Sequence, residues 1–284
     1  MSAALLLLAA WGCGPAGGEA AAGAPAQRER PARLHLAGSD TLLHLAAVWA
    51  EAYHATHPGV TVTVVGGGSG VGIQGLLLGV DDIALSSRPA GAAEQAEARR
   101  RGFALVGTPV ARDAVVVVVH PSNPVVSLSR GQLRRIFSGE VQNWREVGGP
   151  DLPLLAFSRG FSSGTGQIFR EVVFGPGEAG GDGVVQVPGS ALLHDEVARQ
   201  RGAVGYLGLA YLTPRVRPVA VAARDGGPAV APTPANLLTG RYPLTRPLWF
   251  YTRGEPQGAA ADFIRFVLSP QGQRIATEHG YLPR

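Results

Sequence analysis

Three observations predict an α/β fold for this chain of 284 residues. From residue 33 onward, short strand-like segments alternate with segments of helical periodicity. Ala114 to Val119 form a continuous apolar run, which is typical of a strand buried on both faces. Predicted strands end in clusters of serine, threonine and glycine at residues 38–41, 66–70, 86–88 and 158–165. This arrangement is typical of α/β proteins that bind ligands beyond the carboxyl ends of their strands.

The first part of the chain gives the clearest periodicity. Strands are predicted at residues 33–37, 60–64 and 82–85, and helices begin near residues 41, 71 and 90. In the first helix the apolar residues recur at helical spacing, so residues 39–41 lie at its N-terminus.

The remainder alternates in the same way. Strands are predicted at residues 114–119, 152–157, 203–206, 216–221 and 247–251. Ser129 and Gln132 form a capping box for a helix that ends near Phe137. A helix follows residue 165, and two more, at residues 259–268 and 270–278, end the chain.

Composition excludes several classes of protein. The single cysteine excludes a disulfide framework and a thiolate-rich metal site. The 25 basic side chains are all arginine, so the glycine cluster at 66–70 is not a P-loop, which needs lysine. Every cationic contact must therefore come from a planar guanidinium, which is suited to oxyanions.

The histidines and the basic residues indicate neither a metal nor a nucleic-acid site. The 7 histidines include no H-E-x-x-H motif and no i, i+4 ligand pair. The run Arg99–Arg101 lies at the C-terminal end of a predicted helix, where basic residues are favoured. The net charge of +4 is small, and the sequence contains no basic patch interleaved with aromatic residues, which nucleic-acid binding would favour. We therefore expect no metal, no cofactor and no nucleic-acid partner.

Residues 1–31 are predicted to lie outside the fold. A short apolar run precedes Cys13, and a tract rich in alanine, glycine and proline follows it. This pattern resembles a bacterial lipoprotein processing site, in which Cys13 would become the lipid anchor. The alternatives are a secretory signal peptide in which the cysteine is incidental, and a start site that lies elsewhere.

The segment Arg159 to Thr165 carries the strongest chemical signal. Arg159 stands four residues before Ser163, Gly164 and Thr165, between a predicted strand and a predicted helix. Glycine permits close backbone approach, and the first N–H groups of a helix lack intrahelical partners. A tetrahedral oxyanion at this corner would accept bonds from the guanidinium, the hydroxyls and the backbone. The alternative is a surface arginine beside an ordinary helix cap.

These motifs, taken in order, resemble those of the phosphate-binding protein of bacterial phosphate ABC importers, in the type II periplasmic-binding-protein superfamily. The resemblance spans nearly the whole body of the chain, at residues 38–41, 66–70, 82–89, 159–165, 202–206 and 242–244. It implies two α/β lobes joined by two crossing strands, with the ligand in the cleft between them. The implied ligand-binding residues are Thr41, Leu42, Ser69, Ser87, Arg159, Ser163, Gly164 and Thr165.

One position departs from the family pattern. Well-studied members carry an aspartate, which accepts the proton of hydrogen phosphate and repels sulfate, where this chain has Ser87 followed by Arg88. Serine can accept a bond but lacks that negative charge. Asp40 and Asp113 are both candidates for the missing acceptor, and the role of Arg88 stays open.

The resemblance also sets expectations for domains and role. Lobe one is expected at residues 32–112 with 246–284, and lobe two at residues 113–245; the crossing segments are expected near residues 109–114 and 242–251. The expected function is capture of inorganic phosphate outside the cytoplasm, in the periplasm or at the outer face of the membrane. The protein would be a monomer that presents its closed form to the permease subunits of an ABC importer.

Two alternatives remain. Gly160-Phe161-Ser162-Ser163-Gly164 matches the G-x-S-x-G elbow of α/β-hydrolases, with Asp262 and His279 following in the right order. A phosphate-sensing adaptor without a transport role would keep the fold and change only the partner.

Overall fold

The computed structural model describes residues 32–178 and 183–284. The predicted signal segment and linker, including Cys13, therefore lie outside the described residues. Within the described part of the chain, no helix is long and apolar enough to cross a membrane.

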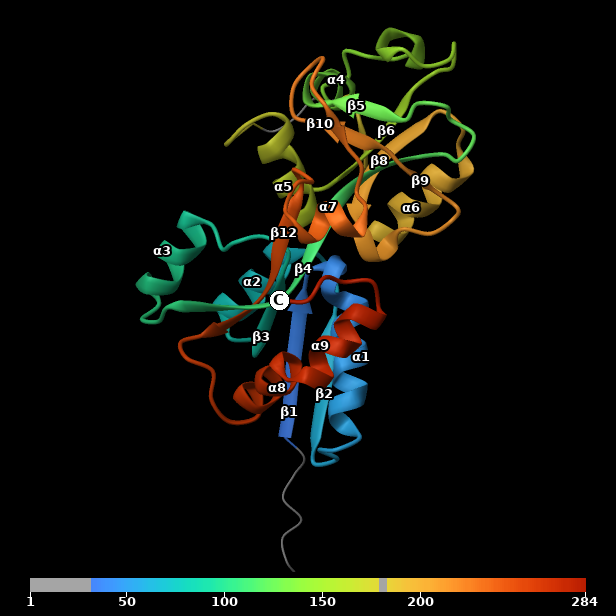
Figure 1. Cartoon of the computed structure of the whole chain (residues 1–284). Helices are drawn as coiled ribbons and strands as arrows, with labels where there is room; N and C mark the ends of the chain where they lie inside the picture. Colours follow the sequence, from blue (N-terminus) through green and yellow to red (C-terminus); the bar gives the residue numbers. More distant parts are fainter. Residues whose placement is uncertain (1–31, 179–182) are drawn as a thin grey trace, which may run out of the picture. The chain divides into compact units, whose positions relative to one another are not determined.

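A mixed sheet runs through this part of the chain, in the order β2-β1-β3-β12-β4-β8-β6-β7 (Figure 1). At one end, β1 (Ala32–Gly38) pairs in parallel with β2 (Val60–Val65) and with β3 (Ile83–Ser86). At the other end, β6 (Leu155–Arg159) pairs in parallel with β7 (Val185–Val187) and with β8 (Ala203–Gly208). The fold is α/β, as predicted.

Helices cover both faces of the first end of the sheet. The helices α1 (Asp40–His54), α8 (Gly258–Leu268) and α9 (Pro270–Glu278) share a core with Ile83 and Leu85. Helices α2 (Ser69–Leu78) and α3 (Ala92–Arg100) pack with Ala84 on the other face. Successive residues of β3 thus point to opposite faces, as the strand geometry requires. We call this region lobe one.

A separate apolar cluster forms around β6, β8 and the valine run of β4. It includes helices α4 (Arg130–Phe137), α5 (Gly164–Val173) and α6 (Ser190–Arg199). A small sheet of β5 (Ser127–Ser129), β10 (Ala220–Ala222) and β11 (Ala229–Val230) lies beside it, with α7 (Pro234–Leu238) and β9 (Arg217–Pro218) nearby. The 3-10 turns η1 (Trp144–Val147) and η2 (Leu209–Tyr211) complete this region, lobe two.

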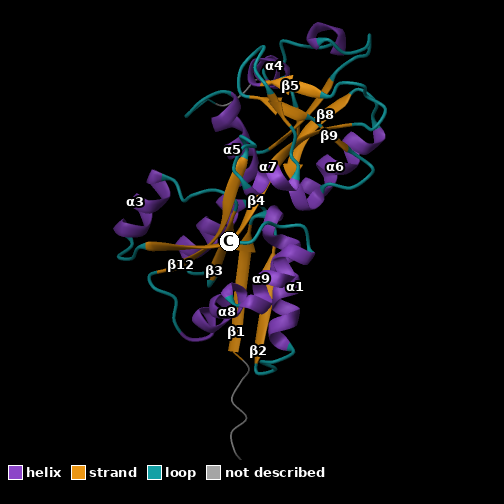
Figure 2. Cartoon of the chain, viewed as in Figure 1, coloured by secondary structure: helices purple, strands orange, loops and turns teal. Residues whose placement is uncertain are grey.

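Two long strands are shared by the lobes. β4 (Leu105–Val119) and β12 (Thr245–Arg253) are antiparallel neighbours, and both run from one lobe into the other in Figure 2. Both strands are longer than predicted. In β4, residues 105–113 were missed because they lack the continuous apolar run that marks the rest of the strand. Proline has no backbone N–H for the strand ladder. Pro109 lies beside a register shift in β12, between Leu248 and Trp249, where the missing hydrogen bond is tolerated.

Further elements differ from the sequence-based expectation, among them short strands and the helix α7. The single strand predicted at residues 216–221 is instead split into β9 and β10, which pair in different sheets. Helix α6 was not predicted, although Leu193 and Val197 give it a buried face at i, i+4 spacing. The capping box of Ser129 and Gln132 is confirmed, with both reciprocal hydrogen bonds present.

Candidate functional site

Three helices begin at the place where the two lobes touch. Thr41 lies in the first turn of α1, Ser69 begins α2, and Gly164 begins α5. Thr41 Oγ1 is 3.0 Å from Thr165 Oγ1, and the Gly70 N–H donates to the Ser162 carbonyl at 2.9 Å. These bonds join lobe one to lobe two, and the positive ends of three helix dipoles meet beside them.

Ser69, Ser87 and Gly164 form the tightest part of this contact. The Ser69 and Ser87 hydroxyl oxygens lie 3.2 Å apart, and the Ser87 N–H donates to Ser69 Oγ at 3.0 Å. A Cβ placed on Gly164 would collide with Ser69 Oγ and would lie 2.6 Å from Ser87 Oγ. Glycine is therefore required at position 164 for this approach of the lobes.

Arg159 is a buried residue, with 2% of its surface exposed, rather than a surface arginine. Its Nη1 donates to Ser190 Oγ at 2.6 Å, and its Nη2 donates to Asp40 Oδ2 at 2.6 Å and to the Pro188 carbonyl at 2.9 Å. The bond to Asp40 is a third link between the lobes. The guanidinium is thus held firmly, and its Nε has no partner.

A second buried guanidinium, which the sequence analysis did not single out, lies on the crossing strands. Arg246 on β12 faces Asp113 on β4 in the strand register, and their side chains form an ion pair with an Nη2–Oδ2 distance of 2.9 Å. The same Nη2 lies 3.1 Å from Thr41 Oγ1 and 2.9 Å from Thr165 Oγ1. Burial lowers the pKa of Arg246, and the neighbouring Asp113 opposes that shift.

Unpartnered donors concentrate around these residues. Of the 7 buried side-chain atoms without a hydrogen-bond partner in the described residues, 4 belong to Ser39, Arg159 and Arg246. Buried polar groups are nearly always paired, so this concentration indicates a place prepared for an acceptor. The surrounding hydroxyls and guanidinium groups suit an anion with several oxygens.

The structure gathers most of the predicted ligand-binding residues here. Thr41, Ser69, Ser87, Ser163, Gly164 and Thr165 are all buried at the lobe contact or at the start of α5. Ser163 also caps α5 by accepting the Gly166 N–H at 3.1 Å, which leaves its own proton free to donate. The N–H of Leu42, the remaining predicted backbone donor of lobe one, is already engaged by the Ser39 carbonyl at 2.9 Å, so it would have to exchange this partner for an anion.

The structure gives Arg88 a different role from that of a ligand. Arg88 Nη1 and Nη2 bind the two carboxylate oxygens of Glu94 at 2.7 and 2.6 Å. Glu94 also accepts the Gly91 N–H at the start of α3. Arg88 therefore fastens α3 to the loop after β3.

The residues of the hydrolase alternative do not assemble. Asp262 Oδ1 accepts from Arg265 within α8, and His279 Nδ1 lies 2.8 Å from the Ile275 carbonyl. Ser162 makes its lobe contact through its carbonyl and is exposed. Neither Asp262 nor His279 has a hydrogen bond to Ser162 in the structure, so the elbow lacks its base.

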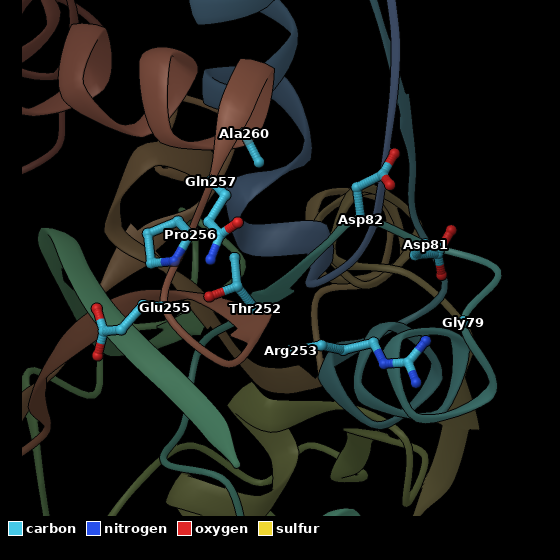
Figure 3. Close-up of a pocket in the computed structure, with 9 residues that line it drawn as sticks. All are labelled: Gly79, Asp81, Asp82, Thr252, Arg253, Glu255, Pro256, Gln257 and Ala260. Atoms are coloured by element: carbon cyan, nitrogen blue, oxygen red, sulfur yellow. The ribbon is translucent and has the colours of Figure 1, made fainter. Parts of the chain in front are cut away.

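A separate hollow lies at the opposite end of lobe one (Figure 3). Asp82, which precedes β3, and Arg253, at the end of β12, line it together with Asp81 and Glu255. Its three carboxylates make it unfavourable for an anion, and burial raises the pKa of Asp81. No group of His, Cys, Asp and Glu in the part of the chain that the structure describes is placed to hold a metal ion.

A two-lobed α/β fold with buried guanidinium groups and hydroxyls where the lobes meet is typical of a solute-binding class of protein. Comparison with known proteins bears this out: residues 20–271 match the family model described as the PBP superfamily domain. The chain belongs to this superfamily, and the resemblance inferred from its motifs is confirmed.

Relatives in curated collections and solved structures cover most of the chain. The phosphate-binding protein PstS of Pseudomonas aeruginosa is 32% identical over 88% of this chain and 82% of its own length. The PstS of Bacillus subtilis is 31% identical over 100% of this chain and 92% of its own length. A substrate-binding protein from Clostridium perfringens, solved with bound phosphate, has a TM-score of 0.80 and 29% identity, and covers 89% of this chain and 99% of its own.

Proposed function

We propose that this chain captures inorganic phosphate outside the cytoplasm and delivers it to an ABC importer. The observation that carries the proposal is the concentration of unpartnered buried donors at the lobe contact, beside three helix N-termini. The names of its relatives, which are phosphate-binding proteins, support the same ligand.

The proposed ligand set divides between the lobes. Thr41, Leu42, Ser69 and Ser87 would contribute from lobe one, through hydroxyl and backbone groups. Arg159, Ser163, Gly164 and Thr165 would contribute from lobe two. Since each lobe holds only half of the donors, the anion favours the closed form in which both halves meet, and this form would be presented to the permease.

The mechanism requires no covalent step. The anion exchanges its hydration shell for buried dipoles and guanidinium groups, whose charge-assisted bonds are strong in a site that excludes water. Opening of the lobes then returns the same anion, unchanged, to the translocation path. The relatives are binding proteins, and a role without catalysis follows from the same chemistry.

Ser87 makes this site permissive toward other oxyanions. Asp40 and Asp113, the two candidate acceptors, have their carboxylates engaged by Arg159 and by Arg246. A hydroxyl at position 87 can accept the proton of hydrogen phosphate or donate to a fully ionised anion. We therefore propose weaker exclusion of sulfate than an aspartate at this position would provide.

The domain division and the anchoring are also part of the proposal. Lobe one would comprise residues 32–112 with 246–284, and lobe two residues 113–245, in line with the separate apolar clusters. Residues 1–31 would be a lipoprotein signal and linker, with Cys13 as the lipid anchor of a monomer. Mass spectrometry of the membrane-extracted protein would test the modification of Cys13.

Calorimetric titration of residues 32–284 with phosphate, sulfate and arsenate tests the ligand. Phosphate is expected to bind, and absence of heat with all three anions would refute the proposal. Arg159→Ala is expected to weaken phosphate binding by at least about 2 kcal/mol, because it removes a buried charge partner. Arg217, whose guanidinium binds backbone carbonyls within lobe two, provides a matched control in Arg217→Ala.

A further inference from the structure

We propose that Arg246, held by Asp113, is a second anion-binding guanidinium of this site and makes a direct contact with the captured oxyanion. The inference rests on the proposed function and adds to it a residue outside the ligand set that the family resemblance implies. The site would then use two arginines, one from lobe two and one from the crossing strands.

The position of the pair is fixed by strand geometry. Arg246 and Asp113 are direct cross-strand neighbours, and both are buried, at 3% and 0% exposure. The second Asp113 oxygen, Oδ1, accepts the Leu209 N–H at 2.9 Å. Because both carboxylate oxygens are engaged, Asp113 has little freedom to turn away, and it holds Arg246 in a single place.

The free donors of Arg246 point to a ligand. Its Nη2 serves Asp113, Thr41 and Thr165, whereas Nε and Nη1 have no partner. A guanidinium has five N–H donors, and burying them without acceptors is costly. Arg159 leaves only its Nε nitrogen unpartnered, so Arg246 offers the larger set of free donors.

The contacts of Arg246 also orient the hydroxyls. Arginine can only donate, so the oxygens of Thr41 and Thr165 must act as acceptors toward Nη2. Each hydroxyl has one proton, and the 3.0 Å contact between the two oxygens can use only one of the two protons. At least one hydroxyl is therefore left to donate to a bound anion.

The location links binding to closure. Thr41 belongs to lobe one and Thr165 to lobe two, and Arg246 touches both from a strand that the lobes share. An anion that engages Nε or Nη1 would therefore strengthen an arrangement that exists only when the threonines are close together. Arg246 would contribute to affinity and to the preference for the closed form.

The test compares two variants that limit the damage of an unpaired buried charge. Asp113→Asn with Arg246→Gln removes both charges together, and Arg246→Lys keeps the charge but loses the planar donors. Phosphate affinity is measured by calorimetry on residues 32–284, after circular dichroism has established the folded state. The double variant is expected to weaken phosphate binding at least about 30-fold, and Arg246→Lys at least about 5-fold. Arg217→Lys, as the matched control, is expected to leave the affinity within about twofold, since its arginine lies outside the site.

The outcomes separate this inference from the proposed function. If the wild-type protein binds none of phosphate, sulfate and arsenate, the proposed function fails. If it binds phosphate and the folded double variant binds as tightly, only the role of Arg246 is refuted. If neither the double variant nor Arg246→Lys folds, Arg246 has a structural role, and the inference is also overturned. A crystal structure with phosphate is expected to place Nε or Nη1 of Arg246 about 2.7–2.9 Å from a phosphate oxygen.

Discussion

Arg88 and Arg246 form two buried ion pairs in the same molecule, with opposite consequences. Arg88 binds Glu94 through both Nη groups, in a bidentate arrangement that also caps α3. Arg246 binds Asp113 through one Nη only and keeps two nitrogens unpartnered. Both guanidinium groups are almost fully buried. The difference lies in the number of unpartnered nitrogens: Arg88 leaves only Nε, whereas Arg246 leaves both Nε and Nη1.

Burial alone does not separate structural arginines from functional ones; their free donors and their position relative to the lobe contact do. The pair of Arg159 with Asp40 leaves only its Nε unpartnered, as Arg88 does, but it joins the two lobes. A buried pair costs desolvation in either case. We therefore expect changes at Arg88 to alter stability, and changes at the cleft to alter binding.

The largest expected effect is on stability at Arg88. Arg88→Met leaves Glu94 partly buried without its partner and should reduce the free energy of unfolding by about 3 kcal/mol, measured by urea titration. The folded variant should keep the phosphate affinity of the wild type. Arg88→Met with Glu94→Leu should recover only part of the loss, because it removes the unpaired charge but also removes the acceptor of the Gly91 N–H. A loss of phosphate affinity greater than about fivefold in the folded single variant would break the comparison.

The second prediction concerns the close approach at Gly164. Gly164→Ala places a methyl group against Ser69 Oγ and Ser87 Oγ, so the lobes should no longer close fully. Phosphate affinity should fall by about 10- to 100-fold, or roughly 1.4–2.8 kcal/mol, with little change in unfolding. Gly160→Ala in the same loop is the matched control. The atom nearest to a Cβ at this position is Gln186 Oε1, at 3.8 Å, so the added methyl group meets no close contact. Equal affinities for the two variants would show that this contact does not limit closure.

Local signals explain why much of the fold and the hydroxyl clusters could be predicted from the sequence. The strand at residues 60–64 alternates with period two, and the Ser129 box involves residues three positions apart. Arg246 lacked such a signal, because Asp113 is 133 positions away and nothing local separates it from the other arginines. Only the antiparallel register of β4 and β12 brings these side chains together. Helix α6, with Leu193 and Val197, carried a readable pattern that the sequence analysis missed.

The smallest expected effect tests the pair of Arg159 with Asp40 through Tyr211. The Tyr211 hydroxyl donates to the Asp40 carbonyl at 2.6 Å, and burial, reinforced by Asp40, raises the pKa of Tyr211 to about 12. The folded state therefore retains this proton more strongly than the unfolded state, whose tyrosine titrates near its ordinary pKa of about 10. The stability that Tyr211 contributes is present below about pH 10 and is lost as the pH rises toward about 12.

Tyr211→Phe removes this titration. The free energies of unfolding of the wild type and the variant should therefore differ most at neutral pH. Their difference in the free energy of unfolding should shrink by about 1–2 kcal/mol between pH 9 and pH 12, allowing for partial solvent screening at this half-buried side chain. Urea titrations of both proteins at each pH measure this difference. The contributions of the other tyrosines are the same in both proteins and cancel. Parallel pH profiles would mean that Tyr211 does not fasten Asp40. The Arg159 pair would then depend on its own hydrogen bonds alone.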